Sequence, residues 1–469
     1  MRPLPLTLAA TVVVLSAAGP QESARVRTTA WSDLAPVRAL LHSRGMTAAE
    51  FPAYLDRVRR ENAARVREGD LDHLVFYLLQ STRFTSEAPI EPALSAKGLV
   101  AGLDAEARAR FLEEGTGAVS PFPAEVAARA GALARALQAP GDDARLLYFR
   151  ELVTGLEPAP GGWPDLLRRE YLRVMRFVYE KEFVAAPSGR AEAVAELYRR
   201  RGLSTDTSVE AGYLVYLGLG MLRALEPERA VRRVLIVGPG LDLAPRTGLA
   251  DERPPASYQP WAVMDALLGL GLAREDVLEV VAADINPRVV AHLRRAREDP
   301  PVLTLISEVA GVQGVRPSED YLAYFAALGR AVGEIVPAPR SQAATAHALR
   351  KEVRIGRGPA SRLHAAHLDI VTGSLEAPPF DLVIATNILP YFDDVQLMLA
   401  MSNVARMLAP GGVLLHNEPR PFLGEVTEAL DLRFEHSRHA VIATAPGAAA
   451  PLGDSVFIHR YRPSGQQPR

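Results

Sequence analysis

The strongest constraint on the fold is a short apolar run that ends in a glycine turn. Residues 234–237 read VLIV, and Gly238, Pro239 and Gly240 follow directly. Four consecutive aliphatic residues bounded by glycine indicate a strand that is buried on both faces. Because glycine has no Cβ, the backbone can turn sharply there and a ligand can approach it closely. Alone, the pattern fits a ligand-binding turn and a plain tight turn equally well.

After this run, strand-like and helix-like segments alternate towards the end of the chain. The further strand candidates are residues 278–283, 368–372, 382–386, 413–416, 440–444 and 455–460. Strands separated by helices are typical of βαβ units and a buried parallel sheet. The last candidate fits an antiparallel strand at the edge. We therefore predict an α/β domain over residues 203–469, with a mostly parallel seven-stranded sheet flanked by helices.

The preceding part of the chain has a helical pattern instead. Phe51, Leu55 and Val58 recur at three- and four-residue spacing within residues 47–67, with charged residues between them. Similar stretches cover residues 71–79, 104–114, 125–137, 146–156 and 166–183. The 469 residues also exceed what one hydrophobic core usually organises. Residues 25–202 are therefore predicted to form a separate all-α domain.

Residues 1–24 have the layout of a secretory signal peptide. One positive charge, Arg2, precedes an apolar run over residues 4–18, and small residues follow. The run is too short for a membrane-spanning helix. The alternatives are a membrane anchor, and an apolar tail without a targeting role. No integral membrane domain is expected beyond this segment.

Composition excludes several classes of function. The formal net charge is -2 and no long block of like charge occurs, so nucleic acid is not a predicted partner. The chain has no cysteine, which excludes disulfides, cysteine nucleophiles and thiolate metal sites. His364 and His367 lie close together, but the other histidines belong to different predicted elements. No metal site is predicted, because metal ligands must converge.

An acidic residue ends the second predicted strand. Asp284 follows residues 278–283, and in nucleotide-binding folds an acid at this point accepts hydrogen bonds from ribose hydroxyls. Alternatively, Asp284 or Asn286 caps a helix that begins at Pro287. Asp284 lies more than twice as far from Gly238 as the roughly 20 positions typical of dinucleotide sites. An insertion over residues 247–259 accounts for much of the excess.

Two later motifs complete the pattern. Residues 380–392 read FDLVIATNILPYF, and residues 408–416 read LAPGGVLLH. In this order, the four motifs resemble the class I S-adenosylmethionine-dependent methyltransferases. Within that class the chain is most similar to the CheR-type chemotaxis-receptor glutamate methyltransferases, which also have a helical domain before the first strand. The resemblance implies a Rossmann-like fold, S-adenosyl-L-methionine as cofactor, and a small-molecule or protein methyl acceptor.

The resemblance also implies roles for individual residues. The implied cofactor-binding set is Gly238, Pro239, Gly240, Asp242, Asp284, Ile285, Asp369 and Asn387. Asp284 would hold the ribose diol, Ile285 would pack on the adenine, and Asp369 would accept the adenine amino group. Asn387, beside the sulfonium, and Tyr391, near the acceptor, are the catalytic candidates. A capping role for Asp369 and a packing role for Tyr391 are the alternatives.

The chain departs from the family pattern in three places. Thr386 replaces an arginine, Ile236 replaces an acid, and Asp242 replaces a third glycine. Three functions therefore stay open: a methyltransferase, a Rossmann-type nucleotide-binding protein, and a cofactor-binding protein without activity. The compartment also stays open, because the leader-like segment indicates export whereas the cofactor is made in the cytoplasm.

Some further side chains have two interpretations at this stage. Tyr391, His416 and Glu418 follow predicted strands and are candidates for a general base, which only some acceptors require. Residues 201–207 precede the helix before the first strand. Ser204, Thr205 or Asp206 could cap that helix, or the segment could close over the cofactor.

Overall fold

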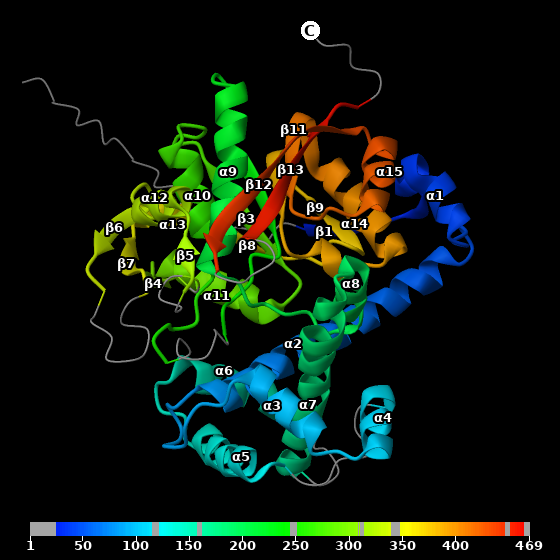
Figure 1. The fold of residues 1–469 in the computed structure, drawn as a ribbon. Helices are drawn as coiled ribbons and strands as arrows, with labels where there is room; N and C mark the ends of the chain where they lie inside the picture. Colours follow the sequence, from blue (N-terminus) through cyan, green and yellow to red (C-terminus); the bar gives the residue numbers. More distant parts are fainter. Residues whose placement is uncertain are drawn as a thin grey trace, which may run out of the picture.

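The structure is a computed structural model, and it describes residues 25–114, 122–156, 162–243, 251–307, 309, 314–338, 348–445 and 451–463. Two bodies are joined by one long helix, α2 (Phe51–Gln80), with a sheet and its helices above and a helical group below (Figure 1). The leader-like residues 1–24 and part of the insertion at 247–259 lie outside the described residues. None of the helices in the described ranges is long and apolar enough to cross a membrane.

The main sheet has eight strands in the order β5-β12-β13-β11-β10-β2-β3-β8. They are β2 (Arg233–Val237), β3 (Glu279–Asp284), β5 (Arg316–Pro317), β8 (Leu363–His367), β10 (Phe380–Ala385), β11 (Leu408–His416), β12 (Leu432–Thr444) and β13 (Leu452–Tyr461). The five strands β8, β3, β2, β10 and β11 run parallel, and β13, β12 and β5 are antiparallel. The sheet is thus mixed, and the two-residue β5 adds an eighth strand to the expected seven.

The order of the parallel strands defines the fold. Numbered by sequence, the five strands lie in the order 3-2-1-4-5, which is that of a doubly wound, Rossmann-like sheet. The chain first winds outward from β2 through β3 to β8, and then returns to the other side of β2 at β10. In such sheets ligands bind at the carboxyl ends of the strands beside this reversal. The edge formed by β3, β2 and β10 is therefore where a site is expected.

Alternating side chains of the strands build two hydrophobic layers. On β2, Val234 and Ile236 face one layer, whereas Leu235 and Val237 face the other. The first layer contains α9 (Val209–Leu225), α10 (Gln259–Gly269) and α11 (Pro287–Glu298). The second contains α14 (Asp394–Met407) and α15 (Pro421–Ala429). Four fully or nearly fully buried aliphatic side chains explain why residues 234–237 form a central strand.

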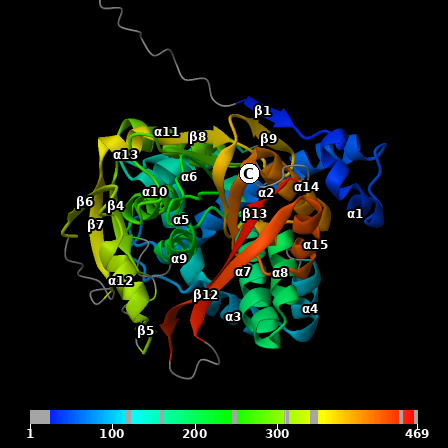
Figure 2. The ribbon, with the colours of Figure 1, turned by 90° about the horizontal axis from the view of Figure 1, so that it is seen from above.

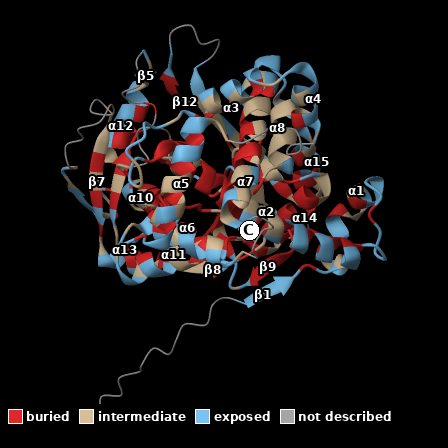
Figure 3. Cartoon of the chain, turned by 90° about the horizontal axis from the view of Figure 1, so that it is seen from below, coloured by how far each residue is buried: buried red, intermediate tan, exposed pale blue. Residues whose placement is uncertain are grey.

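The expected all-α region from residue 25 is not confirmed. It begins with a strand, β1 (Arg25–Thr28), which pairs with β9 (Gly373–Glu376) and is exposed along its length (Figure 3). The next elements are η1 (Trp31–Val37) and α1 (Arg38–Ser43). Leu34, Leu41 and the first half of α2 pack in the same hydrophobic layer as α14. The first part of this region therefore belongs to the body of the sheet.

The lower body consists of helices that pack around the second half of α2. They are α3 (Pro92–Ala101), α4 (Ala105–Glu114), α5 (Ala124–Gln138), α6 (Ala144–Thr154) and α7 (Gly162–Tyr179). After α7 the chain passes through η2 (Glu180–Ala185) and η3 (Ala186–Ser188) into α8 (Ala191–Arg200). The two segments predicted at 47–67 and 71–79 are one helix of 30 residues. At 1.5 Å per residue it is about 45 Å long, enough to reach both bodies.

A second, small sheet was not predicted. Its strands come between α11 and β8 in the sequence and have the order β4-β7-β6, and the sheet lies on the left of Figure 2. Its elements are β4 (Val302–Ile306), β6 (Gly333–Val336) and β7 (Arg350–Ile355), with α12 (Glu319–Ala327) and α13 (Arg357–Ser361) beside them. Its inner residues, such as Leu305 and Val353, extend the first hydrophobic layer.

Candidate functional site

A cavity lies at the carboxyl ends of the parallel strands, at the reversal point of the sheet. The empty space measures about 870 Å³, including the part open to solvent, within the roughly 300–1,000 Å³ of ligand pockets. The predicted site residues that line it are Gly238, Gly240, Asp284, Ile285, Asp369, Asn387 and Tyr391. Residues from the ends of β2 and β3 and from the segments that follow β2, β8 and β10 are thereby brought to one place.

The glycine turn forms one wall of the cavity. Gly238 and Gly240 have φ values of 69° and 72°, which only glycine adopts readily. The N–H of Gly238 donates to the carbonyl of Ala283 at 2.8 Å. A Cβ on Gly238 would lie 2.5 Å from Cγ2 of Ile388. The turn is therefore tied to the end of β3 and packed against the segment after β10.

Asp284 faces the same space from the end of β3. Its side chain is nearly buried, and Oδ2 lies 3.4 Å from the amide nitrogen of Gly240. Oδ1 accepts the N–H of Asn286 at 2.8 Å, while Asn286 itself caps α11 through the N–H of Arg288. Burial raises the pKa of Asp284 to about 6, although the N–H groups of Asn286 and Gly240 oppose this. At neutral pH the group is thus a carboxylate within reach of a bound ligand.

Asp369 reaches the cavity from a turn, not from the expected strand at 368–372. The strand is β8, which ends at His367. The carboxylate of Asp369 accepts the N–H of Val371 at 3.0 Å, and its carbonyl accepts the N–H of Thr372 at 3.1 Å. These bonds bend the chain directly after the strand. The other carboxylate oxygen accepts the side-chain amide of Asn62, on α2, at 3.1 Å.

Pro239 and Asp242, which belong to the implied cofactor set, do not line the cavity. The carboxylate of Asp242 pairs with the guanidinium of Arg253 at 2.8 Å, and both side chains are buried. The N–H of Asp242 donates to the carbonyl of Ala256 at 3.0 Å. Asp242 therefore fixes the described part of the 247–259 insertion to the turn.

The two catalytic candidates lie after β10. Asn387 has a φ of 61°, an uncommon conformation for a residue other than glycine. Its N–H donates to the side chain of Asn417 at 2.9 Å, and its Oδ1 accepts from Asn417 at 2.7 Å. The ring of Tyr391 packs edge-on against Tyr198, with the centroids 5.7 Å apart. Burial raises the pKa of Tyr391, so its hydroxyl stays protonated at neutral pH.

His416 and Glu418, the other candidate bases, line a different cavity. Nε2 of His416 lies 3.1 Å from Nδ1 of His459, and Nδ1 of His416 accepts the N–H of Glu418 at 3.2 Å. Burial lowers the pKa of His416 to about 3 and that of His459 to about 4. Neither imidazole contacts the cavity at the glycine turn.

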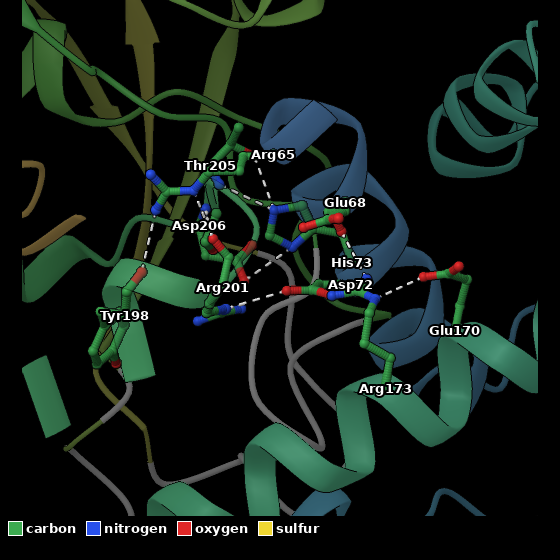
Figure 4. A network of polar contacts seen from close by, with 11 residues as sticks. Arg65, Glu68, Asp72, His73, Glu170, Arg173, Tyr198, Arg201, Thr205 and Asp206 are labelled. Atoms are coloured by element: carbon green, nitrogen blue, oxygen red, sulfur yellow. Dashed lines mark hydrogen bonds and ion pairs between the residues drawn. The ribbon is translucent and has the colours of Figure 1, made fainter. Parts of the chain in front are cut away.

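Residues 203–207 form a roof over the cavity. The cap of α9 is Ser208, so none of Ser204, Thr205 and Asp206 takes the expected capping position. The roof is held by α2: the N–H of Leu203 donates to the carbonyl of Arg65 at 2.8 Å. Figure 4 shows the polar network in which α2, α7, the end of α8 and this segment meet. Helix α2 therefore contributes Asn62 and Val66 to the lining and also holds the roof in place.

Among the lining residues that were not predicted, Asn62 and Gln259 have polar side chains with hydrogen-bond partners at the site. Asn62 orients Asp369, and Nε2 of Gln259 donates to the hydroxyl of Thr386 at 2.7 Å. Thr386, directly after β10, receives this hydrogen bond on its hydroxyl oxygen. Asn62 and Gln259 lie in helices without a recognisable motif, so no local signal could have identified them.

The charged side chains among the described lining residues are Asp206, Asp284 and Asp369, all acidic. A cavity lined in this way has a negative potential and favours a cationic or neutral ligand. It disfavours ligands that bring a phosphate group deep into the site, because phosphates require arginine, lysine or clusters of N–H groups.

No family model and no curated protein matches this chain. Among solved structures, it is similar to the N-methyltransferase NodS from Bradyrhizobium japonicum bound to S-adenosyl-L-homocysteine, at 17% identity over 52% of this chain and 85% of that chain, with a TM-score of 0.27. A TehB-like methyltransferase from Corynebacterium glutamicum matches at 11% identity, 52% and 88% coverage, and a TM-score of 0.26. TrmN from Thermus thermophilus matches at 15% identity, 52% and 48% coverage, and a TM-score of 0.26. Scores this low carry no argument, so the fold assignment stands on the topology.

Proposed function

We propose that this chain is an S-adenosyl-L-methionine-dependent methyltransferase. One observation carries the proposal: the glycine turn after β2 and the carboxylate of Asp284 face a shared cavity, with Oδ2 3.4 Å from the N–H of Gly240. This is the arrangement in which an adenosyl ligand lies along the turn and its ribose diol donates to the acid.

The charge of the cavity supports this cofactor over a dinucleotide. S-adenosyl-L-methionine carries a positive sulfonium and a positive ammonium group, which suit walls lined by Asp206, Asp284 and Asp369. A dinucleotide would bring a pyrophosphate to the same turn without a cationic side chain among the described lining residues. The missing third glycine, replaced by the ion-paired Asp242, points the same way.

The residues present fit the cofactor along its length. Asp369, steadied by Asn62, faces the space where an adenine amino group would lie, and Ile285 supplies an apolar wall. Asp284 would hold the ribose, and Gly238 and Gly240 leave room for the chain between ribose and amino acid. When bound, the cofactor supplies an activated methyl group and its own leaving group. The protein then has to align the acceptor with that methyl group and exclude water.

The acceptor is proposed to be a group that needs no proton removal, such as a carboxylate of a protein or a small molecule. Among the described lining residues there is no histidine, lysine or glutamate, and burial keeps the Tyr391 hydroxyl protonated. The carboxylates of Asp206, Asp284 and Asp369 already contact His73, the N–H of Asn286 and the side chain of Asn62. A carboxylate attacks without a base, whereas most hydroxyls require one. The positive sulfonium of the bound cofactor would offset the negative walls for such an acceptor. The same observation favours the second candidate, a cofactor-binding protein without transferase activity.

Two measurements test the proposal. Calorimetric titration of the full chain should show binding of S-adenosyl-L-methionine and S-adenosyl-L-homocysteine and none of NAD. Incubation with methyl-labelled cofactor and a lysate should then label a protein or small-molecule fraction. Binding of NAD alone would overturn the proposal, and binding of S-adenosyl-L-methionine without any transfer would leave the inactive binding protein.

A further inference from the structure

A histidine of the bridging helix lies directly behind the roof of the cavity. His73, on α2, is completely buried. Its Nε2 lies 3.1 Å from the amide nitrogen of Thr205 and 3.1 Å from the Thr205 hydroxyl. Its Nδ1 lies 3.1 Å from a carboxylate oxygen of Asp206 (Figure 4). The imidazole therefore contacts two consecutive residues of the roof through its two nitrogens.

The chemistry of these contacts fixes the state of the ring. A backbone N–H can only donate, so the Nε2 atom that receives the Thr205 N–H carries no proton. The one proton of the neutral imidazole is then on Nδ1, facing Asp206. A second proton would have to occupy Nε2, where it would meet the Thr205 N–H. The charged ring could turn to the Thr205 hydroxyl instead, but the backbone N–H would still lose its acceptor.

Thr205 also contacts the glycine turn, so the position of the turn depends on that of Thr205. Its carbonyl accepts the N–H of Leu241 at 2.7 Å, and its hydroxyl donates to the carbonyl of Leu241 at 3.0 Å. A Cβ on Gly240 would lie 2.5 Å from the Thr205 carbonyl oxygen. A shift of Thr205 therefore displaces the turn along which the cofactor is proposed to lie.

The surroundings of His73 favour a second proton. Burial acts to lower its pKa, but the carboxylates of Asp206, Asp70 and Asp72 outweigh burial and raise it above the usual imidazole value. The counter-charges are the guanidinium groups of Arg288, on Asp70, and of Arg173 and Arg201, on Asp72. Asp70 also accepts the hydroxyl of Tyr148. These carboxylates therefore favour uptake of a second proton at the imidazole nitrogen that faces Thr205.

We propose that His73 is a positioning residue, and that its neutral form holds the roof against the glycine turn whereas its protonated form loosens the roof. The inference rests on the proposed function for the identity of the ligand. Cofactor affinity then falls as the pH drops through the titration of His73, by up to about tenfold per pH unit. Bound cofactor in turn favours the neutral ring.

The test uses His73→Gln in the full chain. The Gln oxygen can reach the position of Nε2 and accept the Thr205 N–H, but it cannot be protonated. His439→Gln is the matched control, because His439 is an exposed residue on β12. Binding of S-adenosyl-L-methionine is titrated between pH 8.5 and 6.5, above the pKa of about 6 for Asp284. At each pH, the affinity of the unmodified chain is divided by that of His73→Gln, so that the titration of the ligand itself cancels.

Between pH 8.5 and 6.5, the affinity of the unmodified chain and of the control should fall about tenfold more than the affinity of His73→Gln. An equal pH dependence in all three proteins overturns the inference. If none of them binds at any pH, the proposed function fails. The inference is then still decided by hydrogen exchange of the Thr205 and Leu241 amides without ligand. The protection of these two amides, divided by that in His73→Gln at the same pH, should fall as the pH is lowered. A ratio that stays constant with pH would overturn the inference.

Discussion

The carboxylate of Asp70, on α2, accepts a hydrogen bond of 2.9 Å from the side-chain amide of Asn286, which caps α11 behind the β3 acid. The same carboxylate accepts the hydroxyl of Tyr148 at 2.7 Å and pairs with Arg288 at 3.1 Å. Asp70 thus joins three segments that are far apart in sequence. The helical part of the chain is thereby fixed to the edge of the sheet that carries the cavity.

Replacement of this acid tests the junction. Asp70→Ala should lower the free energy of unfolding by about 1.5 to 3 kcal/mol, because it leaves the buried Asn286 and the partly buried Arg288 and Tyr148 without their shared acceptor. Urea unfolding followed by circular dichroism measures the change. The control is Asp56→Ala, since Asp56 is exposed and pairs with the exposed Arg59; its effect should stay within about 0.5 kcal/mol. A loss of less than about 1 kcal/mol for Asp70→Ala would contradict this account.

The central strands could be predicted because their signals are local. The apolar runs at β2, β3, β10 and β11 are short, continuous and bounded by glycine or by an acid, as buried parallel strands require. Their order along the chain also led to the cavity: Gly238, Asp284 and Asn387 follow different strands, and the carboxyl ends of parallel strands meet at one edge.

The roof and the role of α2 could not be predicted from the same signals. Asn62 and His73 lie in an ordinary amphipathic helix, and they reach the site only through tertiary contacts with Asp369 and Thr205. The strand expected at 368–372 was placed five residues late, because its apolar residues are buried in a turn and not in a strand. Burial alone gives an apolar pattern, whereas the hydrogen bonds of Asp369 decide the backbone.

The glycine turn predicts a second substitution effect. Gly238→Ala should destabilise the protein by about 1 to 3 kcal/mol, because φ is 69° and the new Cβ would meet Ile388. The double variant with Ile388→Ala removes the clash but not the backbone strain. In a double-mutant cycle, the double variant should lose less free energy of unfolding than the sum of the losses of the two single variants. Simple additivity of the two losses would show that the contact with Ile388 has no effect.

Arg65 should be sensitive to an exchange that keeps its charge. Its guanidinium donates to the carbonyls of Arg201, Tyr391 and Tyr198 at 3.0, 3.2 and 3.2 Å. Lysine cannot reproduce this fork, so Arg65→Lys should cost about 1 to 3 kcal/mol and expose the 198–207 segment to limited proteolysis. Arg60→Lys, on the exposed face of α2, is the control and should leave the cleavage pattern unchanged. Equal cleavage of both variants would rule out the proposed role of Arg65.

Asp284 predicts opposite effects on stability and on binding. Its pKa of about 6 in the folded protein lies above the ordinary value of 3.8, so the folded state takes up a proton more readily than the unfolded state. The cost of burying the charge is therefore fully present above pH 6, and it declines as the pH falls from 6 towards 4. A shift of this size corresponds to about 3 kcal/mol at pH 8.

Asp284→Asn should accordingly raise the free energy of unfolding at pH 8, by up to about 3 kcal/mol, with a smaller gain at pH 5. It should also weaken binding of S-adenosyl-L-methionine by about 10- to 100-fold, because the ribose diol loses a charged acceptor. Urea unfolding at both pH values and calorimetric titration measure the two effects. Asp276→Asn, at a fully exposed acid, should change neither. Normal binding of S-adenosyl-L-methionine by Asp284→Asn would show that the carboxylate does not hold the cofactor. A gain in stability over the unmodified chain that is smaller at pH 8 than at pH 5 would show that Asp284 does not carry a buried charge.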